Sequence, residues 1–170
     1  MGNQKAELNK SRIPIDDYFM KIAYVVAERS TCLRRKVGAL IVKDKHILST
    51  GYNGAPAGVK DCLEIGSCLR DELNVPSGKD KHLCRAVHSE QNAILQAAKF
   101  GIGVKGATLY CTHNTCMVCA RMIINAGIKK VVTCAERKEA EFEELFKEAG
   151  VEYVRISKPE MTIESMDYRN

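Results

Sequence analysis

Residues 88–127 read HSEQNAILQAAKFGIGVKGATLYCTHNTCMVCARMIINAG, and their hydrophobic period changes twice. Helical spacing of the apolar side chains predicts one helix over 88–99 and another over 116–126. Between them, 107–111 has the short apolar run of a buried strand. Glycines follow both helices, where helices commonly end. This helix–strand–helix unit indicates a protein of the α/β class.

Helix-like and strand-like hydrophobic patterns also occur on both sides of this unit. Further helices are expected over 16–29 and 136–149, and further strands over 37–42, 46–50, 129–133 and 151–156. The apolar face of the first helix is assigned to Tyr18, Phe19, Ile22, Ala23, Val25 and Val26. Gly and Pro are dense over 51–58, so a loop is expected there. The alternation predicts an α/β sandwich around a mostly buried sheet.

The length of 170 residues predicts one domain with a sizeable core. We assign 1–15 to a flexible N-terminal segment, 16–157 to the domain, with a cysteine-bearing insertion at 60–86, and 158–170 to a C-terminal tail. No apolar run is long enough to span a bilayer, and no secretory signal is evident. The eight cysteines therefore fit a cytoplasmic protein with reduced thiols better than a secreted one with disulfides.

The net charge of +5 is spread along the chain. Its densest cluster is Arg34, Arg35 and Lys36, and the chain has no Trp on which single-stranded bases could stack. A solvated cationic surface explains this pattern better than nucleic-acid binding does. No membrane contact is expected.

Three side chains of the central unit have the character of zinc ligands: His88, Cys116 and Cys119. The C-x-x-C spacing lets both thiolates reach one ion from a single helical turn. The strand between the helices returns the chain to the sheet edge where the first helix begins, so both helix N-termini should meet there. The positive end of a helix dipole favours thiolates. Three protein ligands leave a fourth position for water, as in catalytic zinc sites.

Glu90 follows His88 by two positions and is poorly placed to be a further ligand. Zinc lowers the pKa of a bound water toward neutrality. A carboxylate beside that water can accept its proton and return it to a ring nitrogen and to the leaving amine. This is the chemistry of hydrolytic deamination, so Glu90 is the predicted catalytic residue.

Zinc nucleobase deaminases share the signature H-x-E followed by P-C-x-x-C. This chain has His88-Ser89-Glu90 and then Thr115-Cys116-Met117-Val118-Cys119, so Thr115 replaces the proline. We expect Thr115 to cap the helix that carries the two thiolates. A lone C-x-x-C is often a redox pair or half of a structural zinc site. A structural zinc protein is therefore an alternative, although it would not need Glu90.

Five stretches make the chain resemble the deoxycytidylate (dCMP) deaminase family, including relatives encoded in bacterial competence operons. They are CLRRKVGALIV at 32–42, GYNGAPAG at 51–58, HSEQNAI at 88–94, GATLY at 106–110 and MIINAGIKKVV at 122–132. The GYNG loop is similar to the nucleotide-handling branch of the superfamily. His88 also favours the nucleotide-handling branch, because free-nucleoside cytidine deaminases usually have Cys at that position.

The resemblance implies a three-layer, cytidine-deaminase-like sandwich with a five-stranded mixed sheet, and hydrolysis of dCMP to dUMP for thymidylate synthesis. It also implies homo-oligomers, hexamers or dimers, and, in many relatives, activation by dCTP with Mg²⁺ and inhibition by dTTP. By the same resemblance, Asn53, Gly51 and Gly54 contribute to substrate binding. From the residues alone, Asn53 would instead be a turn residue with positive φ.

The remaining cysteines leave a second, structural zinc site open. The resemblance implies ligands at Cys32 and Cys62, and closeness in sequence adds Cys68 and Cys84, with His82 as an alternative ligand. Buried free thiols are the other explanation for these residues. Cys111 and Cys134 are placed on predicted strands and assigned to the core.

Other functions share parts of these motifs. The zinc motif also serves deaminases of tRNA adenosine, which usually lack the GYNG loop, and deaminases of other nucleotides such as dCTP. A DNA-uptake accessory protein with a retained zinc site would instead bind DNA in a salt-sensitive way. Bifunctional riboflavin-pathway deaminases need a second domain, for which 170 residues leave no room.

Overall fold

The computed structural model describes residues 12–76, 79–134 and 140–161. Its centre is one five-stranded sheet with the strand order β2-β1-β3-β4-β5. The strands are β1 (Gly38–Lys43), β2 (His46–Tyr52), β3 (Thr108–Cys111), β4 (Lys130–Thr133) and β5 (Glu152–Arg155). β1 runs antiparallel to both β2 and β3, whereas β3, β4 and β5 are parallel. The expected five-stranded mixed sheet is confirmed.

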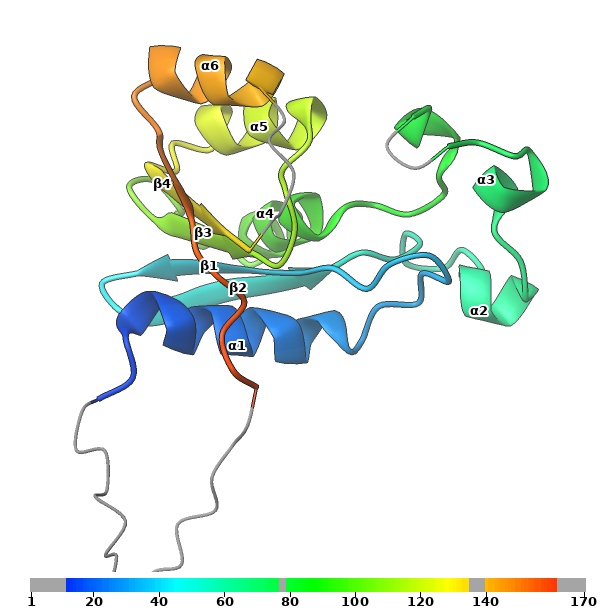
Figure 1. Ribbon diagram of the computed structural model, residues 1–170, viewed down its shortest axis with the longest axis horizontal. Helices are drawn as coiled ribbons and strands as arrows, with labels where there is room; N and C mark the ends of the chain where they lie inside the picture. Colours follow the sequence, from blue (N-terminus) through cyan, green and yellow to red (C-terminus); the bar gives the residue numbers. More distant parts are fainter. Residues whose placement is uncertain (1–11, 77–78, 135–139, 162–170) are drawn as a thin grey trace, which may run out of the picture.

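Helices cover both faces of this sheet, which gives three layers (Figure 1). One face carries α1 (Ile15–Ala27), and the other carries α4 (Ser89–Lys99), α5 (Met117–Asn125) and α6 (Ala140–Glu148). Because both faces are covered, β1 is buried along nearly its whole length. Its alternate residues face opposite layers: Ala39 and Ile41 pack toward α4 and α5, and Leu40 and Val42 pack toward α1.

The apolar face of α1 differs from the expected one. Tyr18 and Val25 are 45% and 56% exposed, so assigning them to the core was wrong. The helix instead buries Phe19, Met20, Ala23 and Ala27. Small residues face the sheet at this point: a Cβ at Gly38 of β1 would lie 2.1 Å from the Ala23 carbonyl oxygen. The close approach of α1 to β1 therefore selects the face that carries the two alanines.

The second strand is longer than expected. β2 continues through Gly51 and Tyr52, so the prediction that the loop begins at Gly51 was wrong. Gly51 is tolerated in the strand because it pairs with Ala39 of β1 and lies against α4, where no side chain would fit. Glycine is needed here because the backbones of β2 and α4 approach closely, and not because the chain turns.

The cysteine-bearing insertion projects to one side of the sandwich (Figure 1). It contains α2 (Cys62–Ile65), α3 (Leu69–Glu72) and the 3₁₀ turn Lys81–Leu83. Asp61 and Glu64 form a capping box at the start of α2, and Gly66 ends that helix with a φ of 79°. The segment is therefore built from single turns of helix, of which α2 is capped, and not from an extended core.

Some of the expected features lie outside the described residues. These are most of the N-terminal segment, the beginning of the helix expected from residue 136, and the tail beyond 161. The domain limits at 16 and 157 therefore stay a prediction. In the part of the chain that the structure describes, no helix combines the length and the apolar character needed to cross a membrane.

Candidate metal centre

The metal centre is built where α4 and α5 begin. His88 is the N-cap residue of α4, and Cys116 is the N-cap residue of α5. β3 lies between these helices in the sequence and ends at Cys111, from which a four-residue loop leads to Cys116. The helix–strand–helix path thus brings both helix N-termini to one edge of the sheet, as the topology predicted.

The three expected ligand side chains meet there. The Nδ1 atom of His88 lies 3.4 Å from the Sγ atoms of both Cys116 and Cys119. All three candidate ligand atoms lie within 4.8 Å of one another. A tetrahedral zinc ion with ordinary Zn–N and Zn–S bonds separates such atoms by roughly 3.6 Å. The arrangement therefore fits a zinc ion, and the imidazole–thiolate donor set suits it chemically.

The two thiols have different proton affinities. Hydrogen bonds from the Cys119 thiol, from His88 and from the backbone N–H of Cys119 lower the pKa of Cys116 to about 3, although burial opposes them. The pKa of Cys119 moves upward, because its thiol donates to Cys116 and is itself buried. The lowered pKa of Cys116 favours its thiolate, which is the form that binds zinc.

Glu90 lies beside these ligands in the first turn of α4 and is only 4% exposed. Burial raises the pKa of its carboxyl group, and hydrogen bonding partly offsets this. The Ser89 hydroxyl donates to Glu90 Oε2 at 2.9 Å. A buried carboxyl group whose proton affinity is raised suits proton transfer.

Thr115 does not cap α5, so that expectation was wrong. The cap is Cys116, whose Sγ accepts a hydrogen bond from the Cys119 backbone at 3.5 Å. The Thr115 side chain is fully buried, and its hydroxyl has no hydrogen-bond partner within the described residues. Capping by the ligand thiolate itself leaves Thr115 as a small packed residue at the proline position.

The loop before Cys116 is held by residues that the sequence did not single out. The Thr112 hydroxyl accepts the backbone N–H of Gly38 at 3.2 Å. The Tyr153 hydroxyl on β5 donates to Asn114 Oδ1 at 2.9 Å and lies 2.9 Å from the Thr133 hydroxyl. Tyr153 lies 39 positions from Asn114, so no local pattern could reveal the contact.

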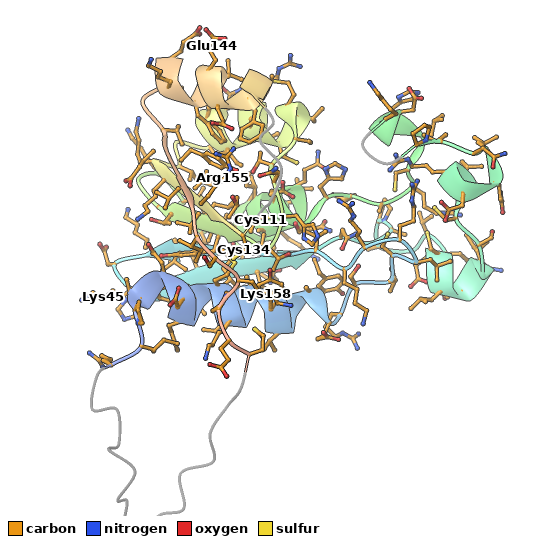
Figure 2. The ribbon with its side chains drawn as sticks, viewed as in Figure 1. Lys45, Cys111, Cys134, Glu144, Arg155 and Lys158 are labelled. Atoms are coloured by element: carbon orange, nitrogen blue, oxygen red, sulfur yellow. The ribbon has the colours of Figure 1, made fainter. Side chains whose placement is uncertain are left out.

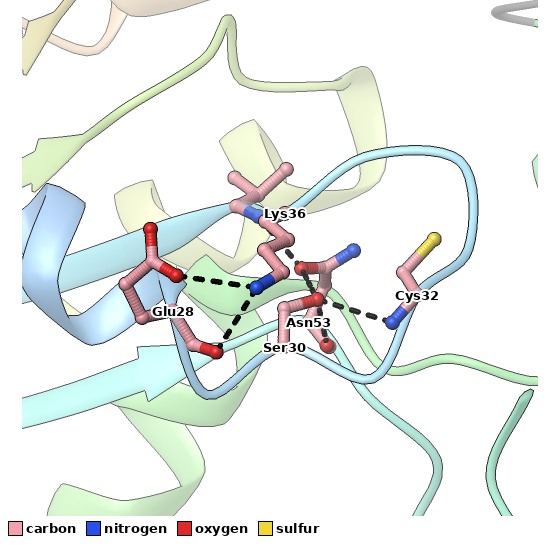
Figure 3. A network of polar contacts seen from close by, with 6 residues as sticks. Glu28, Ser30, Cys32, Lys36 and Asn53 are labelled. Atoms are coloured by element: carbon pink, nitrogen blue, oxygen red, sulfur yellow. Dashed lines mark hydrogen bonds and ion pairs between the residues drawn. The ribbon is translucent and has the colours of Figure 1, made fainter. Parts of the chain in front are cut away.

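Asn53 uses its side chain to fasten a neighbouring loop (Figure 3). Its Oδ1 accepts the Ser30 hydroxyl at 2.6 Å and the Val37 backbone N–H at 2.8 Å, and its Nδ2 donates to the Arg35 carbonyl at 2.9 Å. Asn53 is not among the residues with positive φ. The turn explanation therefore fails, and within the described residues only one of the two Nδ2 hydrogens has a partner.

Gly51 and Gly54 both brace the start of α4. A Cβ at Gly51 would lie 2.2 Å from the Ser89 carbonyl oxygen. Gly54 forms an isolated antiparallel bridge with Val87, with N···O distances of 3.2 and 2.9 Å. Val87 directly precedes His88, so the GYNG loop and the metal-binding turn are fastened to each other.

The remaining cysteines separate into two groups. Within the described residues, no three of Cys32, Cys62, Cys68, Cys84 and His82 place candidate ligand atoms within 4.8 Å of one another. Burial raises the pKa of Cys62, and the thiols of Cys32, Cys68 and Cys84 add to this effect, so they lie near it.

The last two cysteines lie at the C-terminal ends of β3 and β4 (Figure 2). Cys111 is fully buried in the core, as expected. Cys134 is half-buried and packs against the core cluster between α1 and the sheet, so it lies at the margin of the core, and its thiol donates to the Ser157 carbonyl at 3.5 Å. It directly follows the last residue of β4, Thr133.

Comparison with known proteins agrees with this geometry. Residues 14–135 match the family described as the cytidine and deoxycytidylate deaminase zinc-binding region. The chain belongs to this family. The deaminase match includes all three candidate ligands and Glu90.

Individual members of the deaminase family are similar along most of the chain. ComE operon protein 2 of Bacillus subtilis (strain 168) is 40% identical over 154 residues, which are 90% of this chain and 77% of that protein. The deoxycytidylate deaminase of Schizosaccharomyces pombe is 37% identical over 164 residues, which are 94% of this chain but 50% of that protein. The crystal structure of dCMP deaminase from the cyanophage S-TIM5, in complex with dCMP and dUMP, superposes with a TM-score of 0.70 at 32% identity. That match covers 86% of this chain and 99% of the cyanophage chain.

Proposed function

We propose that this protein hydrolyses dCMP to dUMP and ammonia, with zinc held by His88, Cys116 and Cys119. The observation that carries the proposal is the meeting of these three ligand atoms beside the buried carboxyl of Glu90. A structural zinc site has no use for such a carboxyl group. The cyanophage enzyme crystallised with dCMP and dUMP supports this choice of substrate.

The residues divide the chemistry between them. His88, Cys116 and Cys119 would hold the zinc ion, which would supply a Lewis acid that makes water nucleophilic at neutral pH. Glu90 accepts a proton from the attacking water and delivers protons to the ring nitrogen and to the departing amino group. Water thus adds at the amino-bearing carbon and ammonia leaves, so that atoms and charge balance. Zinc binding needs thiolates at Cys116 and Cys119, and a reducing cytoplasm keeps these cysteines from forming disulfides.

Recognition of the 5′-phosphate is assigned to Arg35. Of the cationic cluster 34–36, Arg34 pairs with Asp71 at 3.2 Å and Lys36 with Glu28 at 3.2 Å. Among the described residues, no carboxylate pairs with the Arg35 side chain. Its charge reaches His113, whose pKa is lowered mainly by burial and further by Arg35. Arg35 therefore lies near the loop that leads into Cys116, and its guanidinium group is available to a phosphate.

Asn53 contributes to the same part of the substrate site. Its hydrogen bonds to Val37 and to the Arg35 carbonyl hold the backbone on both sides of Lys36. Its second Nδ2 hydrogen is assigned to the substrate sugar or base. Gly51 and Gly54 are assigned to shaping this site, because they fix the turn that carries His88 and Glu90.

A second zinc ion is proposed for Cys32, Cys62, Cys68 and Cys84. Burial and the nearby thiols of Cys32, Cys68 and Cys84 raise the pKa of Cys62, which indicates that the four thiols lie close together. A metal would give order to a segment that has little core of its own. Two equivalents of zinc per chain in the purified protein would agree with this assignment, and one equivalent would contradict it.

Assembly and regulation complete the proposal. We expect a homo-oligomer, a hexamer or a dimer, activated by dCTP with Mg²⁺ and inhibited by dTTP. Light scattering with and without these nucleotides measures the assembly, and initial rates over a range of dCMP concentrations measure the regulation. A monomer, or rates that ignore both nucleotides, would remove this part while leaving the chemistry in place.

The deciding experiment is an absorbance assay of zinc-loaded protein with dCMP, CMP, deoxycytidine and dCTP. The proposal predicts that dCMP is deaminated with the highest kcat/KM and that a chelator abolishes the reaction. Failure to turn over any cytosine compound would contradict the proposed function. In that case, assays with tRNA adenosine and salt-dependent DNA binding would test the two other functions.

A further inference from the structure

Ser89 separates the candidate ligand His88 from the catalytic Glu90 and is completely buried. Its Oγ lies 2.9 Å from Glu90 Oε2 and 3.7 Å from the Sγ of Cys111. The Ser89 hydroxyl donates to Glu90 Oε2. The oxygen of that hydroxyl is then free to accept the Cys111 thiol hydrogen. The three side chains form a buried polar chain with one direction, from Cys111 through Ser89 to Glu90.

We propose that Ser89 is a positioning residue for the deamination, because it holds Oε2 of Glu90 and so orients the carboxyl group that exchanges protons with water and substrate. Cys111 orients Ser89 in turn. The inference rests on the proposed function, since it assigns a task to a group beside the reacting atoms. It adds a residue that the zinc signature leaves unspecified, since the middle position of H-x-E is open.

The backbone around Ser89 is held in place by β2, and this helps to keep the Ser89 hydroxyl beside Glu90. The Ser89 carbonyl oxygen faces Gly51 so closely that a Cβ there would lie 2.2 Å away. One turn further along α4, the Ala93 carbonyl accepts the buried Ser49 hydroxyl at 2.9 Å. Two contacts from β2 thus lock the first turns of α4. A locked donor fixes a carboxylate at little entropic cost in the reaction.

A purely structural role for Ser89 makes a different prediction. Alanine nearly matches serine in volume and is the better helix former. If Ser89 only fills space, Ser89→Ala should leave kcat unchanged. If it positions Glu90, Ser89→Ala should lower kcat while KM for dCMP, product affinity and zinc content stay the same, because only the transition state uses the oriented carboxylate.

The test compares Ser89→Ala with Ser49→Ala, which removes a buried hydroxyl that also contacts α4 but does not touch Glu90. Ser89→Ala should lower kcat about tenfold, as loss of a hydrogen bond to a charged group does. It should also weaken the binding of a ring-saturated dUMP analogue, which mimics the hydrated base, by a similar factor. Ser49→Ala should lower the melting temperature, and it should lower kcat much less than Ser89→Ala does, because it loosens α4 one turn beyond Glu90 and leaves the donor to Oε2 in place.

Two further variants keep the inference testable if Ser89→Ala folds poorly. Cys111→Ser keeps a donor beside Ser89 and should retain kcat, whereas Cys111→Ala should lower kcat roughly threefold, since a thiol is a weak donor. Full kcat in Ser89→Ala, or equal kcat in both Cys111 variants, would overturn the inference while the parent enzyme stays active. A parent enzyme inactive on every cytosine compound would instead overturn the proposed function itself.

Discussion

A Cβ atom at Gly51 would lie 2.4 Å from the backbone nitrogen of Ala93, so β2 and α4 touch backbone to backbone at this point. No rotamer change can relieve such a contact, because its atoms belong to the main chain of both elements. α4 begins with His88 as its N-cap and carries Glu90 in its first turn. The edge strand therefore sets the position of the catalytic carboxyl through a residue that has no side chain.

Gly51→Ala is expected to push α4 away from β2. Overpacking of this kind destabilises a folded protein by about 1–3 kcal/mol. Because the displacement is transmitted to Glu90, kcat should fall more than this loss of stability explains, even well below the melting temperature. Gly103→Ala is the control, since nothing lies within 4 Å of a Cβ built there. Full kcat in a destabilised Gly51→Ala protein would show that the helix absorbs the strain without moving the carboxyl.

Arg35→Gln is expected to weaken binding of the nucleotide and to spare the chemistry. Loss of one charge-assisted contact to phosphate should raise KM for dCMP about tenfold, while kcat stays near the parent value. The slow reaction of deoxycytidine, which has no phosphate, should not change. Steady-state kinetics on both substrates measure the difference.

Lys36→Gln is the matched control for the phosphate contact. It removes the same charge one position away, from a side chain that pairs with Glu28 at 3.2 Å. Equal effects of Arg35→Gln and Lys36→Gln on KM would mean that only net charge matters. An equal loss with deoxycytidine would place Arg35 at another part of the site.

The sequence was sufficient to predict the helix–strand–helix unit and the meeting of His88, Cys116 and Cys119, because hydrophobic period and parallel topology determine both. It failed on the face of α1, since the choice between Val25 and Ala27 depends on how closely the sheet approaches. The cap expected for α5 was also wrong. Thr115 is a common type of capping residue, and no sequence pattern shows that the neighbouring ligand Cys116 caps the helix instead. Long-range contacts such as Tyr153 with Asn114 join side chains that no local window contains.

Glu90→Gln is expected to abolish turnover and to retain zinc. The amide keeps the shape of the side chain but cannot accept the proton of the attacking water, a loss that typically costs a factor of 10² to 10⁴ in rate. Metal analysis should still find zinc at His88, Cys116 and Cys119, and the melting temperature should stay close to that of the parent. Substantial residual activity would contradict the role of Glu90 as proton carrier. Loss of zinc would instead make Glu90 part of the ligand set.

Tyr153→Phe is expected to loosen the metal-binding loop from a distance. The ring packs against Phe142 and Phe146 with centroid separations of 5.1 and 5.9 Å, and phenylalanine preserves this packing. Only the hydroxyl is lost, and with it the hydrogen bonds to Asn114 and Thr133. Loss of these contacts to the buried Thr133 and the half-buried Asn114 should cost about 1–3 kcal/mol of stability.

The consequence for metal binding follows from the place of Asn114, two positions before Cys116. A less firmly held loop places the Cys116 thiolate less well, so zinc affinity should fall roughly threefold to tenfold, somewhat less than when a group bonded directly to a ligand is lost. Competition with a chelator of known affinity measures the change. Tyr18→Phe is the control, because that ring lies on α1 and is 45% exposed. Unchanged zinc affinity in a destabilised Tyr153→Phe protein would show that β5 supports the fold but not the position of the ligand.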